Sequence, residues 1–541
     1  MPAERTRGRM TLSTSASEKL RTLLSANPLR IVTIAGLVVY LALFAFNTVK
    51  HTGRFASDSM NYVNVARNIL AGKGITQSTL GFNQANFSIE EEIPTPMTAQ
   101  APLYPELIAL FSRVGISTAT SALLLPAIAY GLIFFLVYRL AAELYDERVA
   151  LVATGVLLVY EPLHSLSGYA LSDVVGTAFV FVSCWLLAKQ SKRGKGGLLV
   201  SAGLAGGLAF ATRYALLPVF GIGVLSLLIS SIGWRRKLTD ICLYAAGFAI
   251  PAGIVWAHNF SARGAVMSVP GGGGHDLIKT VAATGFLFER YLGARYPHLQ
   301  AALLGLSLIV FSGILIARRE FFSSGRDLFF SRRRCILVLW SAGYLIFLIL
   351  ILSHSQMGLD GRFIISVGVT LILLWAALAV RATNAPLPWI KAGVLALLVL
   401  AIGREALVAK SSWVLDLEGA VARSQRLTWL ATYTTDQDLI IGNDTVDIPF
   451  LLNRPFTVTF SIRSYNSPAT YEKVVGYARR HCHEYQNIYL VLRSYPETEE
   501  LWRSLFGDFF ADLRFGHLEK YPDIIFVQSL EDGFIFQIVC L

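Results

Sequence analysis

Apolar residues occur along this chain in long runs that charged residues seldom interrupt. A helix needs roughly 20 apolar residues to cross a bilayer. The runs predict eleven membrane spans, at residues 31–48, 119–138, 149–165, 170–188, 197–212, 214–232, 239–258, 298–317, 335–353, 362–380 and 389–408. The third run is short, and the fifth and sixth could instead form one re-entrant pair. An odd number of spans places the two termini in opposite compartments.

Basic residues gather in the segments between alternate runs. They are concentrated in residues 1–30, 189–195, 234–237 and 317–334. All four segments fall on one side of the membrane if the N-terminus is inside, as the positive-inside rule requires. The same count places residues 49–118, 259–297, 354–361 and everything after 408 outside. We therefore expect a multi-pass protein of the plasma or inner membrane, with a cytoplasmic N-terminus and an extracytoplasmic C-terminus.

Composition supports the membrane interpretation. Of 541 residues, 54% are hydrophobic and only 15% are charged, and the mean hydropathy is +0.54. A soluble protein could not bury that much apolar surface. The net charge of +11 could indicate nucleic-acid binding. However, the basic residues lie in short segments between spans, so we predict membrane lipid as a partner and no nucleic acid.

The predicted fold is a polytopic α-helical membrane protein with a C-terminal extracytoplasmic α/β domain. Residues 1–30 form a basic cytoplasmic tail, residues 31–408 the membrane domain and residues 409–541 the α/β domain. In that last part, β-type patterns predict strands at 438–442, 487–492, 523–528 and 534–540. Helical patterns cover 413–433 and 468–481. This alternation of helices and strands is typical of a small α/β domain.

Cysteine usage leaves two interpretations open for the C-terminal domain. Cys482 and Cys540 both fall outside, where a disulfide can form, and two free thiols fit the sequence equally well. The chain contains no CxxC or HExxH pattern. We therefore assign no cofactor, although a divalent metal is compatible with the acidic candidates below.

The first outside loop opens with FASDSMNYVNVARNILAGKG, residues 55–74. Apolar residues recur there at helical spacing, at Tyr62, Val65, Ala66 and Ile69. Three asparagines fall on the opposite face, at Asn61, Asn64 and Asn68. The pattern predicts a helix that lies flat at the membrane surface, with its apolar face toward lipid. Such a helix would hold Asp58 at the lipid–water boundary.

Two aspartates are catalytic candidates. Asp58 could deprotonate an acceptor hydroxyl as a general base. Asp is also a favoured helix N-cap, and on capping statistics alone that role is the more frequent one. Asp173, at the outer end of the fourth span, presents the same choice, because Ser172 or Asp173 could cap that span.

Two arginines are candidates for binding an anion. Arg213 lies between two apolar runs at the outer edge, and Arg362 lies at the outer mouth of the tenth span. A guanidinium group matches the geometry of a phosphate. The alternatives are a snorkelling side chain for Arg213 and a surface pair with Asp360 for Arg362. Lys73 is a further, weaker phosphate candidate.

The second outside loop, 259–297, contains His275 and Asp276 at the start of another helical pattern. Asp276 is a favourable N-cap, which is the interpretation we favour. His275 and Asp276 are also candidates for contact with an acceptor or a metal.

The order of these motifs resembles a known family. They read DSMNYVNVARNILAGKG, APLYPELIALF, GYALSDVVGTAFVF, GLAGGLAFATRYALLPVF and LDGRFIISV, in that order, before the final outside domain. This order resembles the GT-C type membrane glycosyltransferases. The subgroup to which it is most similar is that of the protein O-mannosyltransferase and aminoarabinose-transferase-like enzymes. The resemblance covers most of residues 30–380.

The resemblance implies a sugar transferase that uses a polyprenyl-phosphate-linked sugar donor. The sugar would pass, with inversion, to a hydroxyl of an acceptor glycan, lipid or protein on the outer face of the membrane. Asp58 matches the family's catalytic acidic position, and Arg213 and Arg362 lie where such enzymes hold the lipid phosphate. The main alternative is a multi-span transporter of a lipid or small solute. Transporters place their ionisable groups near the bilayer midplane, whereas here they lie at the rim.

Two positions depart from the family pattern. Many relatives carry a second acidic residue beside the catalytic one, whereas Asp58 lies between Ser57 and Ser59. Aminoarabinose-transferase-like enzymes carry a lysine before their PPLY-type turn. Here the turn reads QAPLYP, with Gln100 in that place.

The orientation can be tested with a reporter that is active only outside the cytoplasm. Fused after residue 541, it should be active, and fused after Lys195 it should be silent, because the positive-inside count places these points on opposite sides. The reverse pattern would contradict the architecture.

Overall fold

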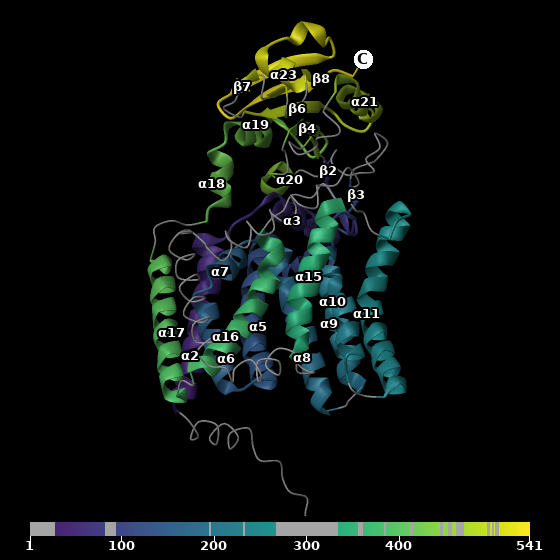
Figure 1. The fold of residues 1–541 in the computed structure, drawn as a ribbon. Coiled ribbons are helices and arrows are strands. Elements are labelled where there is room, and N and C mark those ends of the chain that lie inside the picture. The colour runs from purple at the N-terminus through teal and green to yellow at the C-terminus, as the bar shows by residue number, and fades with distance from the viewer. Residues whose placement is uncertain are drawn as a thin grey trace, which may run out of the picture.

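The computed structural model describes fourteen stretches of the chain. They are residues 28–81, 94–193, 196–230, 233–266, 334–354, 361–383, 386–410, 415–443, 447–452, 457–460, 470–494, 498–499, 502–503 and 508–540. Two layers result: a bundle of long apolar helices, and a mixed sheet with its own helices above one end of it (Figure 1). We call that end of the bundle the sheet side.

The bundle contains a helix at every predicted span that falls within the described residues. The helices are α2 (Pro28–Asn47), α5 (Thr118–Leu144), α6 (Glu147–Leu158), α7 (Glu161–Ser167), α8 (Ser172–Arg193), α9 (Gly196–Thr212), α10 (Pro218–Leu228), α11 (Trp234–Arg263), α15 (Cys335–His354), α16 (Ile365–Thr383) and α17 (Leu387–Ala409). The predicted span 298–317 lies outside the described residues.

Length and composition separate these helices further. Within the described residues six are long and apolar enough to cross a membrane alone. The pair α6 and α7 adds a seventh span if the two are taken together, with a bend of 60° between them. Helices α9, α10 and α15 are shorter apolar helices. The bundle is therefore a multi-span membrane fold, and the count of eleven stays a prediction.

Helices α9 and α11 pack closely because glycines face the partner backbone. A Cβ atom built on Gly203 would come within 1.9 Å of the Tyr244 carbonyl oxygen. One built on Gly247 would come within 2.1 Å of the Val200 carbonyl oxygen. Small residues of this kind let membrane helices approach until their backbones touch. A larger side chain at either position would force the two helices apart.

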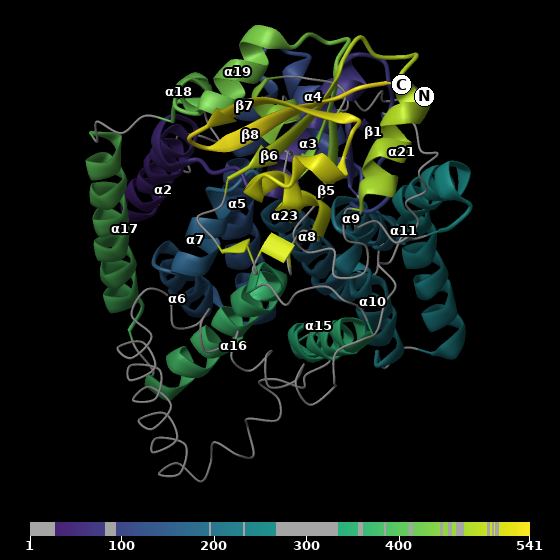
Figure 2. The ribbon, with the colours of Figure 1, turned by 90° about the horizontal axis from the view of Figure 1, so that it is seen from above.

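The sheet has six strands in the order β2-β5-β4-β6-β8-β7. Its strands are β2 (Thr79–Gly81), β4 (Leu439–Asn443), β5 (Thr457–Phe460), β6 (Ile488–Arg493), β7 (Ile524–Leu530) and β8 (Gly533–Ile538). The first four in the spatial order pair in parallel, and β8 and β7 are antiparallel. Seen from above, the sheet lies over α3 and α5, with α17 and α11 at opposite edges of the bundle (Figure 2).

Several sequence predictions can be compared with this sheet. Strands are present at all four predicted positions, as β4, β6, β7 and β8. The predicted helix 413–433 is instead two helices, α18 (Leu417–Ala422) and α19 (Gln425–Tyr433), because Ser424 caps the second. The remaining helices here are α20 (Asp447–Leu451), α21 (Tyr471–His481) and α23 (Asp508–Phe515). Strand β2 comes from the first loop and was not predicted.

Helix α3 (Ser57–Leu70) lies between the bundle and the sheet (Figure 1). The prediction that its apolar face rests on lipid was wrong. Tyr62, Val63 and Ala66 are buried in the protein's own core, together with residues of α4 (Leu103–Ser112) and α5. The helix is therefore buried between the bundle and the sheet, and protein contacts both of its faces.

The asparagine face of α3 is also buried. Asn64 Oδ1 accepts a hydrogen bond from the Ser78 backbone N–H at 2.7 Å. Asn68 donates to the Thr76 carbonyl oxygen at 2.9 Å. These bonds hold the short strand β1 (Thr76–Gln77), which pairs with β3 (Thr95–Pro96) in antiparallel fashion. The asparagine face of α3 therefore binds residues 76–78 of the first loop rather than water.

Helix α20 connects the C-terminal region to α3. Arg67 Nη1 donates to the carbonyl oxygens of Pro449 at 3.0 Å and Phe450 at 2.8 Å. The Phe450 ring packs 4.7 Å from the Phe55 ring, measured between centroids, and belongs to the core of the membrane bundle. Orphan carbonyls at a helix C-terminus favour a cation. Arg67 supplies it, and so fixes α20 on α3.

Cys482 and Cys540 form a disulfide, with their Cα atoms 5.9 Å apart. This answers the choice that the sequence left open. The bond joins the end of α21 to the residues just after β8. It closes a loop across a sequence separation of 58 residues. Chain-entropy arguments give such a loop a stabilisation of about 4 kcal/mol.

Differential alkylation should detect this bond. In denatured, unreduced protein, iodoacetamide should label Cys184, Cys242 and Cys335 and leave Cys482 and Cys540 unlabelled until reduction. The physical reason is that an oxidising compartment maintains the disulfide. Mass spectrometry of the peptides gives the readout. Full labelling of Cys482 and Cys540 before reduction would contradict both the bond and the outside location of this domain.

Candidate functional site

The start of α3 is fixed against the start of α8 by a short backbone bridge. The Arg54 N–H donates to the Gly168 carbonyl oxygen at 3.0 Å, and the Ala170 N–H donates to the Arg54 carbonyl oxygen at 3.0 Å. The Arg54 guanidinium also lies over the Tyr169 ring, 5.4 Å from its centroid. The two helices therefore begin side by side, although more than a hundred residues separate them.

Asp58 lies at the second position of α3 and does not cap the helix. The N-cap residue is Ala56, whose backbone N–H donates to Ser59 Oγ at 3.0 Å. Asp58 Oδ2 instead accepts a hydrogen bond from Arg362 Nη1 at 2.6 Å. Asp58 Oδ1 accepts one from Gln100 Nε2 at 3.1 Å. The capping interpretation of Asp58 is therefore wrong, and its carboxylate faces two other segments of the chain.

Asp173 and Arg213 form a second ion pair. Asp173 occupies the first turn of α8, and Arg213 occupies the break between α9 and the short 3-10 turn Tyr214–Leu216. Arg213 Nη1 lies 2.5 Å from Asp173 Oδ1. The break leaves Arg213 in an extended conformation, with φ −158° and ψ 119°, which lets its side chain turn toward α8. Arg213 is therefore paired, and its charge does not reach the membrane surface by snorkelling.

Phe363 joins the two pairs. The guanidinium carbon of Arg213 lies 4.5 Å from the Phe363 ring centroid, and that of Arg362 lies 5.9 Å from it. A guanidinium over an aromatic face is attracted by the electrons of the ring. Tyr62, on α3, is close enough to both aspartates and to Arg213 for their charges to act on its hydroxyl. The four charged side chains thus form one cluster at the sheet side of the bundle.

The two pairs differ in their access to solvent. The side chains of Asp58 and Arg362 are 31% and 22% exposed, whereas those of Asp173 and Arg213 are 2% and 14% exposed. The carboxylate of Asp58 is therefore accessible to solvent, whereas that of Asp173 is not. Chemically, the outer pair offers a proton acceptor beside a cation. The inner pair offers a second cation, whose position a buried carboxylate fixes.

Other predicted site residues do not join this cluster. Lys73 follows the C-terminal end of α3, about 20 Å along the helix axis from Asp58. His275 and Asp276 lie outside the described residues, and so does Asp360, the alternative partner considered for Arg362.

Sequence reasoning missed the roles of Phe363 and Gln100. Phe363 directly follows Arg362, but nothing in the pattern distinguished it from other apolar residues. Gln100 was recognisable only as the residue that occupies the place of a lysine. Its bond to Asp58 depends on the fold of the loop between β3 and α4.

A second polar cluster ties the last described span to the first. Glu405, buried in α17, accepts a hydrogen bond from Asn47 Nδ2 at 2.7 Å and lies 3.0 Å from His164 Nε2. Arg404 Nη1 donates to Glu161 Oε2 at 3.1 Å. A charge inside a helix bundle needs partners of this kind. We assign this cluster a structural role, because it links α2, α7 and α17.

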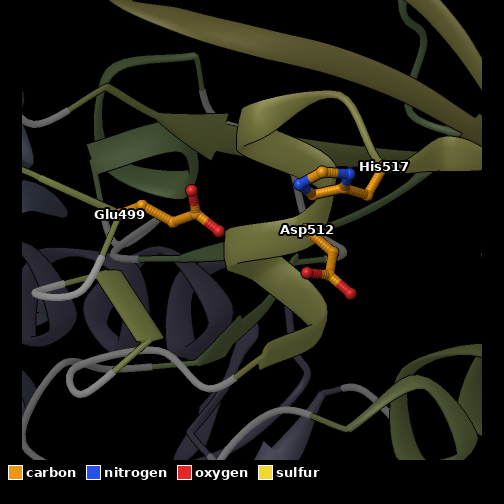
Figure 3. A group of neighbouring side chains, drawn as sticks. All are labelled: Glu499, Asp512 and His517. Atoms are coloured by element: carbon orange, nitrogen blue, oxygen red, sulfur yellow. The ribbon is translucent and has the colours of Figure 1, made fainter.

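Three metal-capable side chains, Glu499, Asp512 and His517, lie at one end of α23 (Figure 3). Their carboxylates already have cationic partners. Arg503 lies 2.6 Å from both Glu499 and Asp512, and Lys520 lies 2.8 Å from Asp512.

These contacts decide the charge state of Asp512. Burial disfavours its ionised form, but hydrogen bonds from Lys520, Arg503 and Tyr521 outweigh burial and lower the pKa of Asp512 to about 2. The group is therefore an ion-pair network that stabilises the domain, and we do not assign a metal to it.

Comparison with known proteins gives a family match for part of the chain and fold matches for nearly all of it. Residues 99–257 match the family model described as dolichyl-phosphate-mannose-protein mannosyltransferase. That range includes Gln100, Asp173 and Arg213. No curated protein matches the chain in sequence.

Solved structures match over nearly the whole chain. ArnT from Cupriavidus metallidurans, bound to undecaprenyl phosphate, is similar with a TM-score of 0.54 and 12% identity, over 97% of this chain and 98% of that one. The oligosaccharyltransferase of Archaeoglobus fulgidus in its apo form gives 0.53 and 14%, over 94% and 74%. The archaeal oligosaccharyltransferase AglB from the same organism, in complex with an inhibitory peptide and a dolichol-phosphate, gives 0.51 and 15%, over 94% and 74%.

At these identities the structural matches establish the fold, and the family model adds a match in sequence. The resemblance predicted from the sequence is thereby confirmed: this chain has the fold of the GT-C type membrane glycosyltransferases, and its residues 99–257 match the dolichyl-phosphate-mannose-protein mannosyltransferase family.

Proposed function

We propose that this protein transfers a sugar from a polyprenyl-phosphate donor to an acceptor hydroxyl on the outer face of the plasma or inner membrane, with inversion at the anomeric carbon. In this proposal Asp58 is the general base, and Arg213 and Arg362 bind the donor phosphate. The observation that carries the proposal is the pair formed by Asp58 and Arg362, with 2.6 Å between carboxylate and guanidinium, in a partly exposed position at the sheet side.

In this proposal the pair supplies the two requirements of the reaction, a base and a cation. An acceptor hydroxyl attacks the anomeric carbon as its proton passes to Asp58, and a new carbon–oxygen bond forms. The bond between the anomeric carbon and the phosphate oxygen breaks, and its electron pair stays with the phosphate. Arg362 and Arg213 then stabilise the negative charge on the departing polyprenyl phosphate. Atoms, electrons and the transferred proton balance without a further reactant.

The geometry allows Arg362 to meet the phosphate without leaving the cluster. A guanidinium has five N–H donors arranged as a planar fork. Asp58 Oδ2 accepts a hydrogen bond from Nη1, and a phosphate oxygen competes for the same group. A phosphate bound there pulls Arg362 away from the carboxylate. This frees a lone pair on Asp58 for the acceptor proton.

Asp173 has a different proposed role. With its side chain 2% exposed, it cannot touch an acceptor, so we no longer place it among the catalytic residues. Its charge holds Arg213 in position and offsets the cost of burying that guanidinium. It is a positioning residue for the phosphate-binding arginine.

The donor class is supported by the solved relatives. ArnT was solved with undecaprenyl phosphate, and AglB with a dolichol-phosphate and an inhibitory peptide. The predicted alternative, a multi-span transporter, is not favoured by the family match or by these folds. If the proposal is correct, a strain lacking this protein accumulates a polyprenyl-phosphate sugar, which mass spectrometry of its lipids detects. That lipid is the donor used in the assays below.

Asp58→Asn should lower the turnover by about 10² to 10⁴-fold, because an amide cannot take the acceptor proton. Folding should be little affected, since the N-cap of α3 is Ala56 and an amide oxygen at position 58 can still accept the hydrogen bond from Arg362. The measurement is release of polyprenyl phosphate by purified protein, with the melting temperature recorded beside it. Asp146→Asn is the matched control, because Asp146 caps α6 through the Val149 N–H, and Asn caps equally well. An Asp58→Asn enzyme with more than about half of the wild-type turnover would exclude Asp58 as the base.

Arg362→Ala should weaken binding of undecaprenyl phosphate about 10- to 100-fold, because a hydrogen bond to a charged group contributes roughly 1.5–3 kcal/mol. Arg362→Lys should restore only part of this, since the planar fork is lost. Arg213 should behave alike, but its removal leaves Asp173 buried without its cation. It is therefore best tested in an Asp173→Asn background.

The control for general charge effects is Arg404→Ala, an exposed arginine paired with Glu161. Its affinity for undecaprenyl phosphate should equal that of the wild type. If Arg362→Ala and the Arg213→Ala double variant also retain wild-type affinity, these arginines only neutralise the aspartates.

A further inference from the structure

Three amide side chains form a chain that ends on Asp58. Gln100 Nε2 donates to Asp58 Oδ1 at 3.1 Å. Asn61 Nδ2 donates to Gln100 Oε1 at 3.0 Å and to Gln77 Oε1 at 3.2 Å. The three amides come from the loop before α4, from α3 and from β1. Three separate segments therefore meet around one carboxylate.

The direction of this chain follows from chemistry. An ionised carboxylate only accepts hydrogen bonds, so Gln100 must present its NH₂ group to Asp58. Its carbonyl oxygen then faces the other way and needs a donor. Asn61 must therefore turn its own NH₂ group toward Gln100, which leaves Asn61 Oδ1 buried with no donor among the described residues. The charge of Asp58 thus fixes the orientation of two further side chains.

The far end of the chain is rigid. Gln77 is 3% exposed and lies in β1, where it pairs with Thr95 of β3. The Met97 N–H donates to the Ile75 carbonyl oxygen at 3.0 Å and continues this pairing toward Gln100. The loop that carries Gln100 is therefore anchored to β1 three residues before it, at Met97.

We propose that Gln100, oriented by Asn61, is a positioning residue that holds the Asp58 carboxylate when Arg362 engages the donor phosphate. This inference rests on the proposed function, in which Asp58 is the base. Among the described residues each carboxylate oxygen has one hydrogen-bond partner, Arg362 for Oδ2 and Gln100 for Oδ1. When the phosphate draws Arg362 away, the bond from Gln100 is what keeps the carboxyl plane from rotating. The terminal torsion of an aspartate is otherwise broad.

The first test is Gln100→Met, which keeps the length of the side chain and removes the N–H donor. We expect kcat to fall about 10-fold while the affinity for undecaprenyl phosphate stays at the wild-type value, because both arginines are intact. The acid limb of the kcat/KM profile should move up by about one pH unit, since a donor that favours the carboxylate is gone. The other charged groups around Asp58, namely Arg362, Arg213 and Asp173, with Tyr62 on α3, are unchanged in this variant.

The second test is Asn61→Asp, which is almost isosteric. The new carboxylate places two acceptor oxygens opposite Gln100 Oε1, which is itself an acceptor. The Gln100 NH₂ group is then attracted by two carboxylates, at positions 58 and 61. The acid limb should again move to higher pH. In the double variant with Gln100→Met, the loss of kcat should be smaller than the product of the two single losses, because both changes break one chain. Two independent effects would instead multiply.

Asn68→Asp is the matched control on the same helix. Asn68 is buried and donates to the Thr76 carbonyl oxygen and to Ser78 Oγ, so its replacement disturbs the same loop without touching Asp58. We expect a lower melting temperature and an unchanged pH profile. A merely structural role for Gln100 predicts the same pattern for Gln100→Met.

The outcomes separate this inference from the proposed function. If Asp58→Asn is inactive and Gln100→Met keeps the wild-type acid limb, the positioning role is wrong and the general base stands. If Asp58→Asn stays active, the proposed function itself is wrong. Should Gln100→Met fail to fold, Gln100→Glu keeps the shape of the amide. It should move the acid limb further up, because it sets a second negative charge beside Asp58. An unmoved limb in that variant also overturns the inference.

Discussion

Two carboxylate–guanidinium pairs at the sheet side of an apolar bundle are the interaction on which the site depends. A lone charge beside a hydrocarbon interior is costly, and pairing lets four charges gather there. The pairs share Phe363 as a common neighbour and differ in exposure, so the carboxylate of Asp58 is accessible and that of Asp173 is buried. Any anion that binds must compete for guanidinium groups that already have partners. Binding of the anion to Arg362 and release of Asp58 from Arg362 are therefore a single event.

The membrane layer was largely predictable, because the bilayer imposes a visible composition. Runs of about 20 apolar residues gave the positions of the described helices, and the strands of the C-terminal region were visible in β-type patterns. The connections between the layers were not predictable. Thr79–Gly81 is too short to stand out as a strand, and Phe450 enters the bundle from a helix of only five residues. Such contacts depend on tertiary packing rather than on a local pattern.

Charge at the rim of the spans was enough to select Asp58, Asp173, Arg213 and Arg362 from the sequence. It could not give their partners, because Asp58 and Arg362 are 304 positions apart and several spans separate them. The helix that carries Asp58 was predicted from its periodicity, but its environment was not. A stripe of apolar residues indicates burial, and it does not tell lipid from protein. Gln100 shows a further limit, since an amide has no charge to mark it as part of a site.

Strand β2 has a consequence for how the protein is made. Thr79 pairs with Thr457, so the edge of the sheet contains residues that follow the first span and residues that follow the last. At 5–20 residues per second, synthesis leaves roughly 20 to 80 seconds between them. During that time Asn64 and Asn68 can already hold β1, but β2 has no neighbour, and Asp58 has no Arg362 until the tenth predicted span is reached. The four charged residues of the cluster are thus all synthesised before β5, and the sheet that lies above them is completed only afterwards, late in synthesis.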